Sequence, residues 1–192
     1  MGTEPQLRTR QLLLRRWRNE DRTPFAALNA DPAVMEHFPA TLRHDESDAL
    51  VDRIEAGFEQ RGWGLWAVEA PGSAPFVGFV GLNPATFDAP FTPAVEIGWR
   101  LAREHWGKGY ATEGALAALA FGFDTLSLDE IVSFTTNANM RSRQVMERLD
   151  MQHDDADDFE NPNVPVGDPC RPHVLYRLAR HAWQRNSARA AR

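Results

Sequence analysis

The chain has 192 residues, of which 43% are hydrophobic and 25% are charged, and its formal net charge at pH 7 is −6. This composition supplies enough apolar surface for a packed core and excludes a wholly disordered chain. The acidic balance makes duplex DNA a poor candidate partner, because nucleic-acid-binding domains usually carry a basic excess.

The chain contains one cysteine, Cys170, so no disulfide can form within it, which fits a reducing compartment. Its first eight residues lack the apolar run of a signal peptide. The longest apolar run, residues 115–121, is far shorter than the roughly 20 residues needed to span a bilayer. We therefore expect a single cytoplasmic domain over residues 1–192 with no membrane association.

Hydrophobic periodicity and turn residues predict alternating strands and helices. The predicted strands cover residues 12–17, 65–69, 76–82, 94–101, 131–135 and 173–178. The predicted helices cover residues 24–28, 45–60, 112–126 and 139–149. Prolines mark residues 83–93 and 161–172 as loops, and residues 150–160 form an acidic run.

Three local patterns fix this organisation further. Asp21 and Thr23 before Pro24 are typical of a helix start. Leu50, Ile54 and Phe58 recur every four residues, which places them on one face of the helix at 45–60. The turn between 65–69 and 76–82 predicts an antiparallel hairpin, and the later strand–helix–strand order permits 94–101 and 131–135 to pair in parallel.

The stretch WGKGYATE, residues 106–113, lies between a predicted strand and a predicted helix. Glycines there let the backbone turn tightly, and the first N–H groups of a helix form an anion site suited to a diphosphate. Lys108, the only lysine of the chain, adds a point charge. The stretch is neither a Walker motif nor a Rossmann fingerprint, since Thr112 stands where a third glycine is required. A plain glycine-containing loop remains the alternative.

Asn139 and Ser142 follow the fifth predicted strand and lie three residues apart at a helix start, so they share a face. Asn139 is also a good N-cap, which is the structural alternative for this residue.

In this order and spacing, these segments resemble the GCN5-related N-acetyltransferase (GNAT) superfamily, in its RimJ/RimL-like, ribosomal-protein N-acetyltransferase branch. The matching segments are TRQLLLR at 9–15, GFVG at 78–81, VEIGW at 95–99, WGKGYATE at 106–113, N-x-x-S-x-x-VMERL at 139–149 and HVLYRL at 173–178. The resemblance covers about residues 8–180 and leaves an arginine-rich tail at 181–192. It implies an α/β (α+β) fold with a mixed, mostly antiparallel sheet flanked by helices, in which the fourth and fifth strands are parallel and splayed.

The resemblance also implies acetyl-CoA as acetyl donor and an amine as acceptor. Backbone amides of the glycine-containing loop would hold the phosphates, the end of the fourth strand would pair with the pantetheine arm, and Asn139 would bond to it. The cofactor-binding residues implied in this way are Trp99, Arg100, Leu101, Trp106, Gly107, Lys108, Gly109, Tyr110, Ala111, Thr112, Asn139 and Ser142.

Three residues depart from the family pattern. Glu104 stands three residues before the first loop glycine, where the family often has Gln or Arg. Met146 occupies the place of a tyrosine general acid, so Ser142 or a water would have to protonate the leaving thiolate. Asp150 stands where a glycine commonly ends the helix predicted at 139–149.

Acetyl transfer to an amine requires a neutral amine, and at pH 7 only about one lysine-like amine in a few thousand is neutral. Glu96 on the fourth strand is the candidate base, acting directly or through water, unless it is a solvated carboxylate or an ion-pair partner. A backbone N–H near Arg100 or Leu101 is the candidate oxyanion donor. Ser142 is the candidate acid, unless it only supports the helix start.

The acceptor is either a protein N-terminus or a small molecule, and a non-catalytic acyl-CoA sensor is the alternative function. The aromatic side chains that could line an acceptor pocket, if they are not core residues, are Trp63, Trp66, Phe38, Phe87 and Phe91. The six histidines, among them His105 beside the loop, show no metal-binding spacing, so no metal is expected. We expect a monomer or homodimer without nucleic-acid partners.

Overall fold

The computed structural model describes residues 6–190, with side chains described up to Asn186, and leaves the first five residues outside. The chain divides into two compact units, one formed by Met1–Asn83 and Gly98–Ala118, the other by Pro84–Ile97 and Leu119–Arg192. We describe each unit by itself, and a single domain over 1–192 stays a prediction. No helix among the described residues has the length and apolar character needed to cross a membrane.

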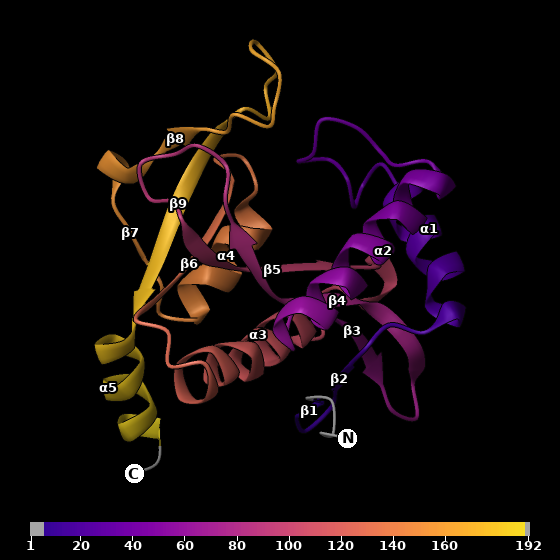
Figure 1. Cartoon of the computed structure of the whole chain (residues 1–192), viewed down its shortest axis with the longest axis horizontal. Coiled ribbons are helices and arrows are strands. Elements are labelled where there is room, and N and C mark those ends of the chain that lie inside the picture. The colour runs from indigo at the N-terminus through magenta and orange to yellow at the C-terminus, as the bar shows by residue number, and fades with distance from the viewer. Residues whose placement is uncertain (1–5, 191–192) are drawn as a thin grey trace. The chain divides into compact units, whose positions relative to one another are not determined.

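The first unit contains a run of antiparallel strands in the order β1-β2-β3-β4, with two helices, α1 and α2, side by side (Figure 1). Its elements are β1 (Leu7–Arg8), β2 (Leu13–Arg15), α1 (Arg22–Ala30), α2 (His44–Arg61), β3 (Leu65–Ala70) and most of β4 (Ala74–Ala85). Residues 65 and 81 pair across the β3–β4 hairpin, which confirms the predicted antiparallel turn.

Helix α2 begins and ends as its sequence indicates. The Glu46 carboxylate accepts a hydrogen bond from the Arg43 backbone N–H (2.8 Å), and Gly62 closes the helix with a φ of 76°. Val51, Ile54 and Phe58 are buried, and Phe58 packs edge-on against Trp66 of β3. Leu50 is half-buried, and Val51 is buried beside Ile54.

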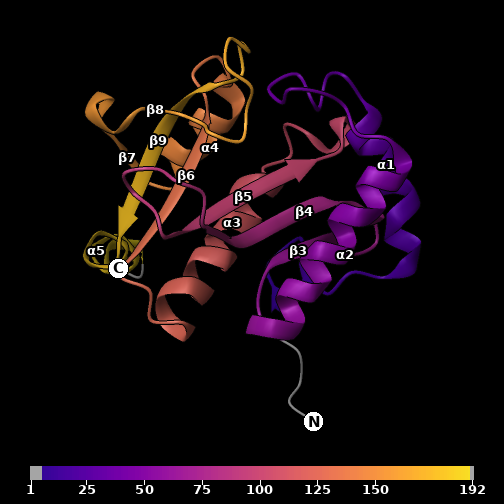
Figure 2. The same cartoon turned by 45° about the horizontal axis from the view of Figure 1, so that its top comes forward.

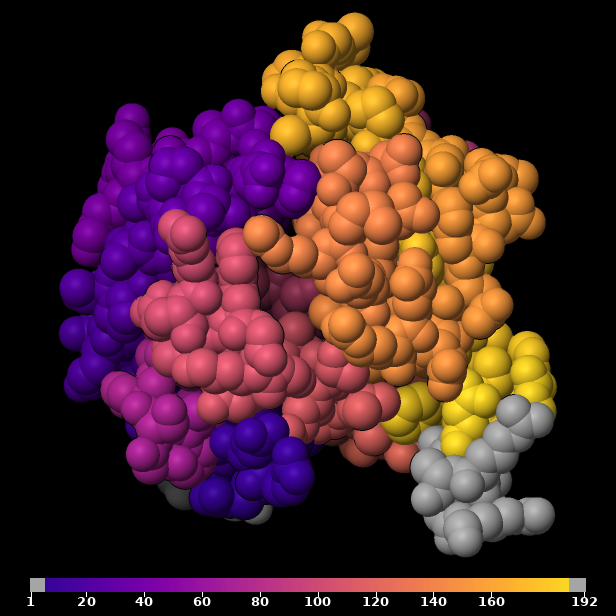
Figure 3. All heavy atoms as spheres, turned by 180° about the vertical axis from the view of Figure 1, so that it is seen from behind, coloured from indigo at the N-terminus to yellow at the C-terminus, as the bar shows by residue number. Residues whose placement is uncertain are grey.

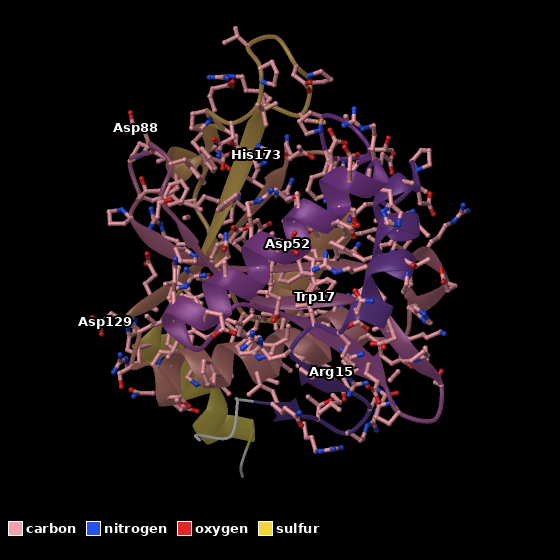
Figure 4. The ribbon with its side chains drawn as sticks, turned by 45° about the vertical axis from the view of Figure 1, so that its right-hand side comes forward. Arg15, Trp17, Asp52, Asp88, Asp129 and His173 are labelled. Atoms are coloured by element: carbon pink, nitrogen blue, oxygen red, sulfur yellow. The ribbon has the colours of Figure 1, made fainter. Side chains whose placement is uncertain are left out.

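Arg15 at the end of β2, labelled in Figure 4, is fully buried and ion-paired. Its guanidinium contacts Asp21 (2.7 Å) and Glu69 (2.9 Å). The Asp21 carboxylate also accepts from the Arg18 backbone N–H, so it serves this cluster and makes no capping bond to α1. Asp21 therefore occupies the N-cap position of α1, as expected, but its side chain binds Arg15 and Arg18 and does not cap the helix.

The second unit is built on the long antiparallel pair β6 (Glu130–Thr136) and β9 (Pro172–Ala179) (Figure 2). Short strands β7 (Gln152–His153) and β8 (Phe159–Glu160) pair with β9. Strand β5 (Ala94–Leu101) pairs in parallel with β6 at Glu96 and Val132, which confirms the predicted parallel pairing. The predicted splay concerns residues of both units and stays a prediction.

Two of the later helices differ from those predicted. Helix α4 (Met140–Arg148) matches the prediction, but the arginine-rich tail forms helix α5 (Arg180–Ala190), where none was predicted. The ring of Trp183 stacks on that of Phe123 at 5.6 Å and gives this helix an apolar contact. Helix α3 (Tyr110–Ala120), most of which belongs to the first unit, starts two residues earlier than predicted and is followed by a π-helical turn, Phe121–Thr125, in the second unit.

Two strand boundaries also differ. Strand β4 continues through Pro84 to the buried Ala85, although the prolines predicted a loop from residue 83. The strand predicted at 12–17 is limited to Leu13–Arg15, and the short strand β1 before it was not predicted.

Candidate functional site

The glycine-containing loop lies in the first unit, between β5 and α3. A short 3₁₀ turn, Arg103–His105, leads into it, and Trp106 anchors it by donating from Nε1 to the Leu101 carbonyl oxygen (2.8 Å). Gly107 and Gly109 have φ values of 74° and 79°, in the left-handed region. A Cβ at either position would meet no atom within 4 Å, so these glycines are required by the backbone path and leave open space above it.

The first N–H groups of α3 are available for a ligand. The helix begins at Tyr110, and its first recorded backbone bond across the loop runs from the Glu113 N–H to the Gly109 carbonyl oxygen (3.0 Å). In the described part of the chain, no acceptor is recorded for the N–H groups of residues 107–112. Unpaired amides at the positive end of a helix dipole suit an anion, so these residues fit a diphosphate.

Glu113 is the carboxylate in the first turn of α3, and it is turned toward the amino-terminal segment. It accepts hydrogen bonds from the Thr9 hydroxyl (2.6 Å), the Gln11 backbone N–H (2.7 Å) and the Gln11 side chain (2.6 Å). Burial raises its pKa, but the bonds from Thr9 and Gln11 outweigh burial and hold the pKa below its usual value. Figure 3 shows this amino-terminal segment (indigo) against the start of α3 (coral).

The side chains next to the loop contribute little positive charge for binding an anion. Lys108 is exposed, with Nζ 5.9 Å from the centre of the buried Tyr110 ring. The Nδ1 atom of His105 is buried without a partner among the described residues, and burial lowers the pKa of this histidine. Glu104 is exposed. The backbone amides are therefore the main anion-binding groups of the loop.

At the end of β5, the backbone of Arg100 and Leu101 passes very close to β4. Gly78 has a φ of 134°, and a Cβ there would collide with the Arg100 carbonyl oxygen. The Ala102 N–H donates to the Val77 carbonyl oxygen (3.0 Å) and holds the two segments together. No side chain larger than hydrogen fits at residue 78, which gives the GFVG motif a physical reason.

Glu96 lies in the second unit, on the part of β5 that pairs with β6. Its side chain is half-buried, and no hydrogen bond or ion pair is recorded for its carboxylate among residues 6–186. Desolvation raises its pKa from 4.5 to about 8. The ion-pair alternative for Glu96 thus has no support, and a carboxyl group that titrates near pH 8 is suited to exchange a proton with an amine.

Asn139 and Ser142 lie together at the start of α4, as expected. The Asn139 Oδ1 accepts from the Ser142 N–H (3.2 Å), and its Nδ2 donates to the Thr135 hydroxyl (2.9 Å). The capping role of Asn139 is therefore present, and it leaves one N–H and one lone pair of the amide for a ligand. The Ser142 hydroxyl is half-buried, with no partner recorded in the part of the chain that the structure describes.

Two departures from the family pattern have structural counterparts. Met146 is buried in the second unit, so it supplies packing rather than a proton. Asp150 has a φ of 58°, which explains why glycine is common at this place. The buried Tyr176 hydroxyl of β9 accepts from the Arg143 guanidinium (3.2 Å) and donates to Glu147 (3.4 Å).

The aromatic candidates separate into core and partly exposed groups. Trp66 is fully buried core, and the Arg61 guanidinium lies over the ring of the half-buried Trp63. In the second unit, half-buried rings form one cluster that the sequence indicated only in part. Its members are Phe87, Phe91, Phe134, Phe159 and His173.

The acidic run contains a grouping that histidine spacing did not indicate. One ligand atom each of His153, Asp155 and Asp158 lies within 4.8 Å of the others. The His153 ring lies 2.8 Å from Asp158 and 3.7 Å from Asp155, so a hydrogen bond within the run accounts for the grouping.

Comparisons with known proteins agree with these features. Residues 11–152 match the model of a family described as "Acetyltransferase (GNAT) domain". The FsC-acetyl coenzyme A-N(2)-transacetylase of Aspergillus fumigatus is 30% identical over 189 residues, which cover 95% of this chain and 79% of that protein. The uncharacterized protein YkkB of Bacillus subtilis is 29% identical over 80% of this chain and 88% of its own.

Solved structures share the fold. A GNAT-family acetyltransferase from Bacillus anthracis superposes with a TM-score of 0.76 at 22% identity, covering 92% of this chain and 99% of that one. RimL, a ribosomal L7/L12 α-N-protein acetyltransferase solved in complex with coenzyme A, gives 0.72 at 16% identity, covering 93% and 99%. The predicted family and fold class are confirmed.

Proposed function

Because the chain belongs to the acetyltransferase (GNAT) domain family, we propose that it transfers the acetyl group of acetyl-CoA to a primary amine in a ternary complex. The acceptor is a protein N-terminus or a small molecule. The observation that carries the proposal is the row of unpaired amides at residues 107–112, at the start of α3. This arrangement meets the requirements of a diphosphate with backbone groups alone.

The remaining predicted residues take roles along the donor. Backbone groups of Trp99, Arg100 and Leu101 pair with the pantetheine arm, and one of their N–H groups stabilises the carbonyl oxygen as negative charge develops. The amide of Asn139 binds the same arm with its free N–H and lone pair. The name of the Aspergillus relative, which contains acetyl coenzyme A, supports this choice of donor.

In the reaction, the amine nitrogen forms a bond to the thioester carbonyl carbon, and the bond from that carbon to sulfur breaks. Glu96 accepts the proton that the ammonium group must lose, directly or through water, and its raised pKa keeps the proton exchange near balance. After attack the nitrogen carries a surplus proton; Ser142 donates its hydroxyl proton to the departing thiolate and regains one from this nitrogen, directly or through water, so that the amide and the thiol leave neutral. Met146 cannot do this, because a thioether has no acidic proton.

Calorimetry with coenzyme A tests the cradle. Gly109→Val places a β-branched side chain at a φ of 79° and in the space above the loop, so we expect at least a tenfold loss of affinity. Gly72→Val is the matched control, because Gly72 has a φ of 77° and open space in the β3–β4 turn. Equal affinities of the two variants, or no heat with the unmodified protein, would refute the cradle.

Release of free coenzyme A with a panel of peptides and small amines tests the transfer step. The expected result is release that depends on one class of amine. Tight binding without acceptor-dependent release would contradict the proposed activity.

A further inference from the structure

The half-buried Arg100 carries a positive charge that no carboxylate of the described chain neutralises. Its Nη1 donates to Asn29 Oδ1 of α1 (2.6 Å), which is the one hydrogen bond recorded for this side chain. Its Nε is buried without a partner. Desolvation lowers the pKa of Arg100 to about 10, with no compensating negative charge. The fully buried Arg15 of the first unit, by contrast, has two carboxylate partners.

The guanidinium is held in one orientation by neutral groups. Asn29 is fully buried, and its Nδ2 donates to the buried Ser47 hydroxyl of α2 (2.9 Å). The Phe38 ring lies 4.2 Å from the guanidinium carbon and the Phe79 ring 5.5 Å from it. Phe38 is 39% exposed, so this end of the arrangement borders solvent. Hydrogen bonding and cation–π contacts thus fix the group without satisfying its charge.

The geometry of the guanidinium identifies its free side. With Nη1 bound to Asn29, the edge formed by Nε–H and Nη2–H has no recorded partner among residues 6–186. These two donors are parallel and match the two oxygens of a carboxylate. A guanidinium whose buried Nε–H has no partner is costly to keep unless an anion completes it.

We propose that the Nε–Nη2 edge of Arg100 binds a carboxylate of the amine acceptor. The proposal rests on the proposed function, in which the backbone of residues 99–101 contacts the reacting end of the donor, so the side chain of the same residue meets the acceptor. The substrates it selects are amines that also carry a carboxylate, such as amino acids or peptides with an acidic residue.

The donor is a less suitable source of the anion. The groups that orient the guanidinium come from α1, from β4 and from the segment that holds Phe38. No contact between the guanidinium and residues 106–112 is recorded in the described chain, so the diphosphate cradle and the arginine fork are built from different segments.

Nuclear magnetic resonance of the full chain labelled with ¹⁵N-arginine tests binding directly. The Nε–H signal of Arg100 is assigned by its loss in Arg100→Lys, and matched ligands are added with and without coenzyme A. The pairs are phenylalanine and phenethylamine, lysine and cadaverine, and the peptide amides Ala-Glu-Ala and Ala-Gln-Ala. We expect the signal to move with a carboxylate-bearing member and to stay with its partner. An Arg100 signal that no carboxylate moves overturns the proposal.

Kinetics with the same pairs separates a specificity role from a structural one. Arg100→Lys keeps the charge but loses the fork, so we expect the ratio of kcat/KM for the carboxylate-bearing acceptor to kcat/KM for its partner to fall about 10- to 100-fold. Arg53→Lys, at an exposed position of α2, is the control. An equal fall for both members of each pair overturns the proposal.

Calorimetry with coenzyme A and dephospho-coenzyme A separates the two proposals. Unchanged donor affinity in Arg100→Lys is expected, whereas a loss confined to coenzyme A would assign the fork to its 3′-phosphate and overturn the acceptor role. Absence of donor binding in the unmodified protein refutes the proposed function instead, and the Nε–H titration still decides whether Arg100 binds carboxylates.

Discussion

Replacing Glu96 by glutamine tests both the chemistry and the electrostatics of the second unit. The native state holds the Glu96 proton from pH 4.5 to about 8, where the unfolded chain has already released it. The native state therefore binds more protons in this window, and the free energy of unfolding falls as the pH rises through it. A glutamine side chain has the same shape and no titratable proton. The free energy of unfolding of Glu96→Gln should therefore not fall over this pH range.

The magnitude follows from the displaced pKa. Each pKa unit corresponds to about 1.4 kcal/mol, so the shift to about 8 sets an upper limit of about 5 kcal/mol. Residual solvent access to the half-buried side chain screens the charge, and we expect about 2–4 kcal/mol. Glu96→Gln should match the unmodified protein near pH 5 and exceed it in stability by this amount above pH 8.

Urea unfolding from pH 5 to 9 measures the difference, with Glu104→Gln at an exposed position as control. In parallel, the rate of acetyl transfer by the unmodified protein should rise with pH to a plateau above about 8, and Glu96→Gln should lose about 10²- to 10⁴-fold on that plateau. A stability difference that does not vary with pH would refute the desolvated carboxyl group. An unchanged kcat at every pH would remove Glu96 from the mechanism.

Ser142→Ala removes the hydroxyl and keeps the backbone N–H that donates to Asn139. Acetyl-CoA affinity and melting temperature should therefore stay the same, while kcat falls about 10²-fold or more. A normal kcat would show that Ser142 only supports the helix start. Asp150→Gly should raise the free energy of unfolding by about 1 kcal/mol, because glycine adopts the φ of 58° without strain. The exposed hydrogen bond from Asn186 that the variant loses contributes little. A lowered melting temperature would show that this hydrogen bond outweighs the strain.

Most long elements could be predicted because each carries its own boundary signals. Helix α2 has a carboxylate at its start and Gly62 at its end, and β5 is an apolar alternating run between prolines and a polar turn. Asn139 and Ser142 are brought together by local helix geometry, so their proximity follows from spacing.

The errors fall where distant contacts decide. Helix α5 depends on the stack of Trp183 on Phe123, a residue far earlier in the chain, and its arginines alone indicate a solvated tail. Strand β4 continues past Pro84 to the buried Ala85, and no residue near Ala85 in the sequence indicates this burial. The unused fork of Arg100 was not predictable either, because it depends on Asn29, Phe38 and Phe79 from three other segments.

The three hydrogen bonds that Glu113 accepts from Thr9 and Gln11 connect the amino-terminal segment to the start of α3 and affect the electrostatics of the loop. A free carboxylate in that first turn would repel a diphosphate and compete for the same dipole. Thr9 and Gln11 instead take up its lone pairs and draw it aside. Residues far away in the sequence thereby hold this carboxylate in a fixed position, and removal of the segment that carries Thr9 and Gln11 would release it.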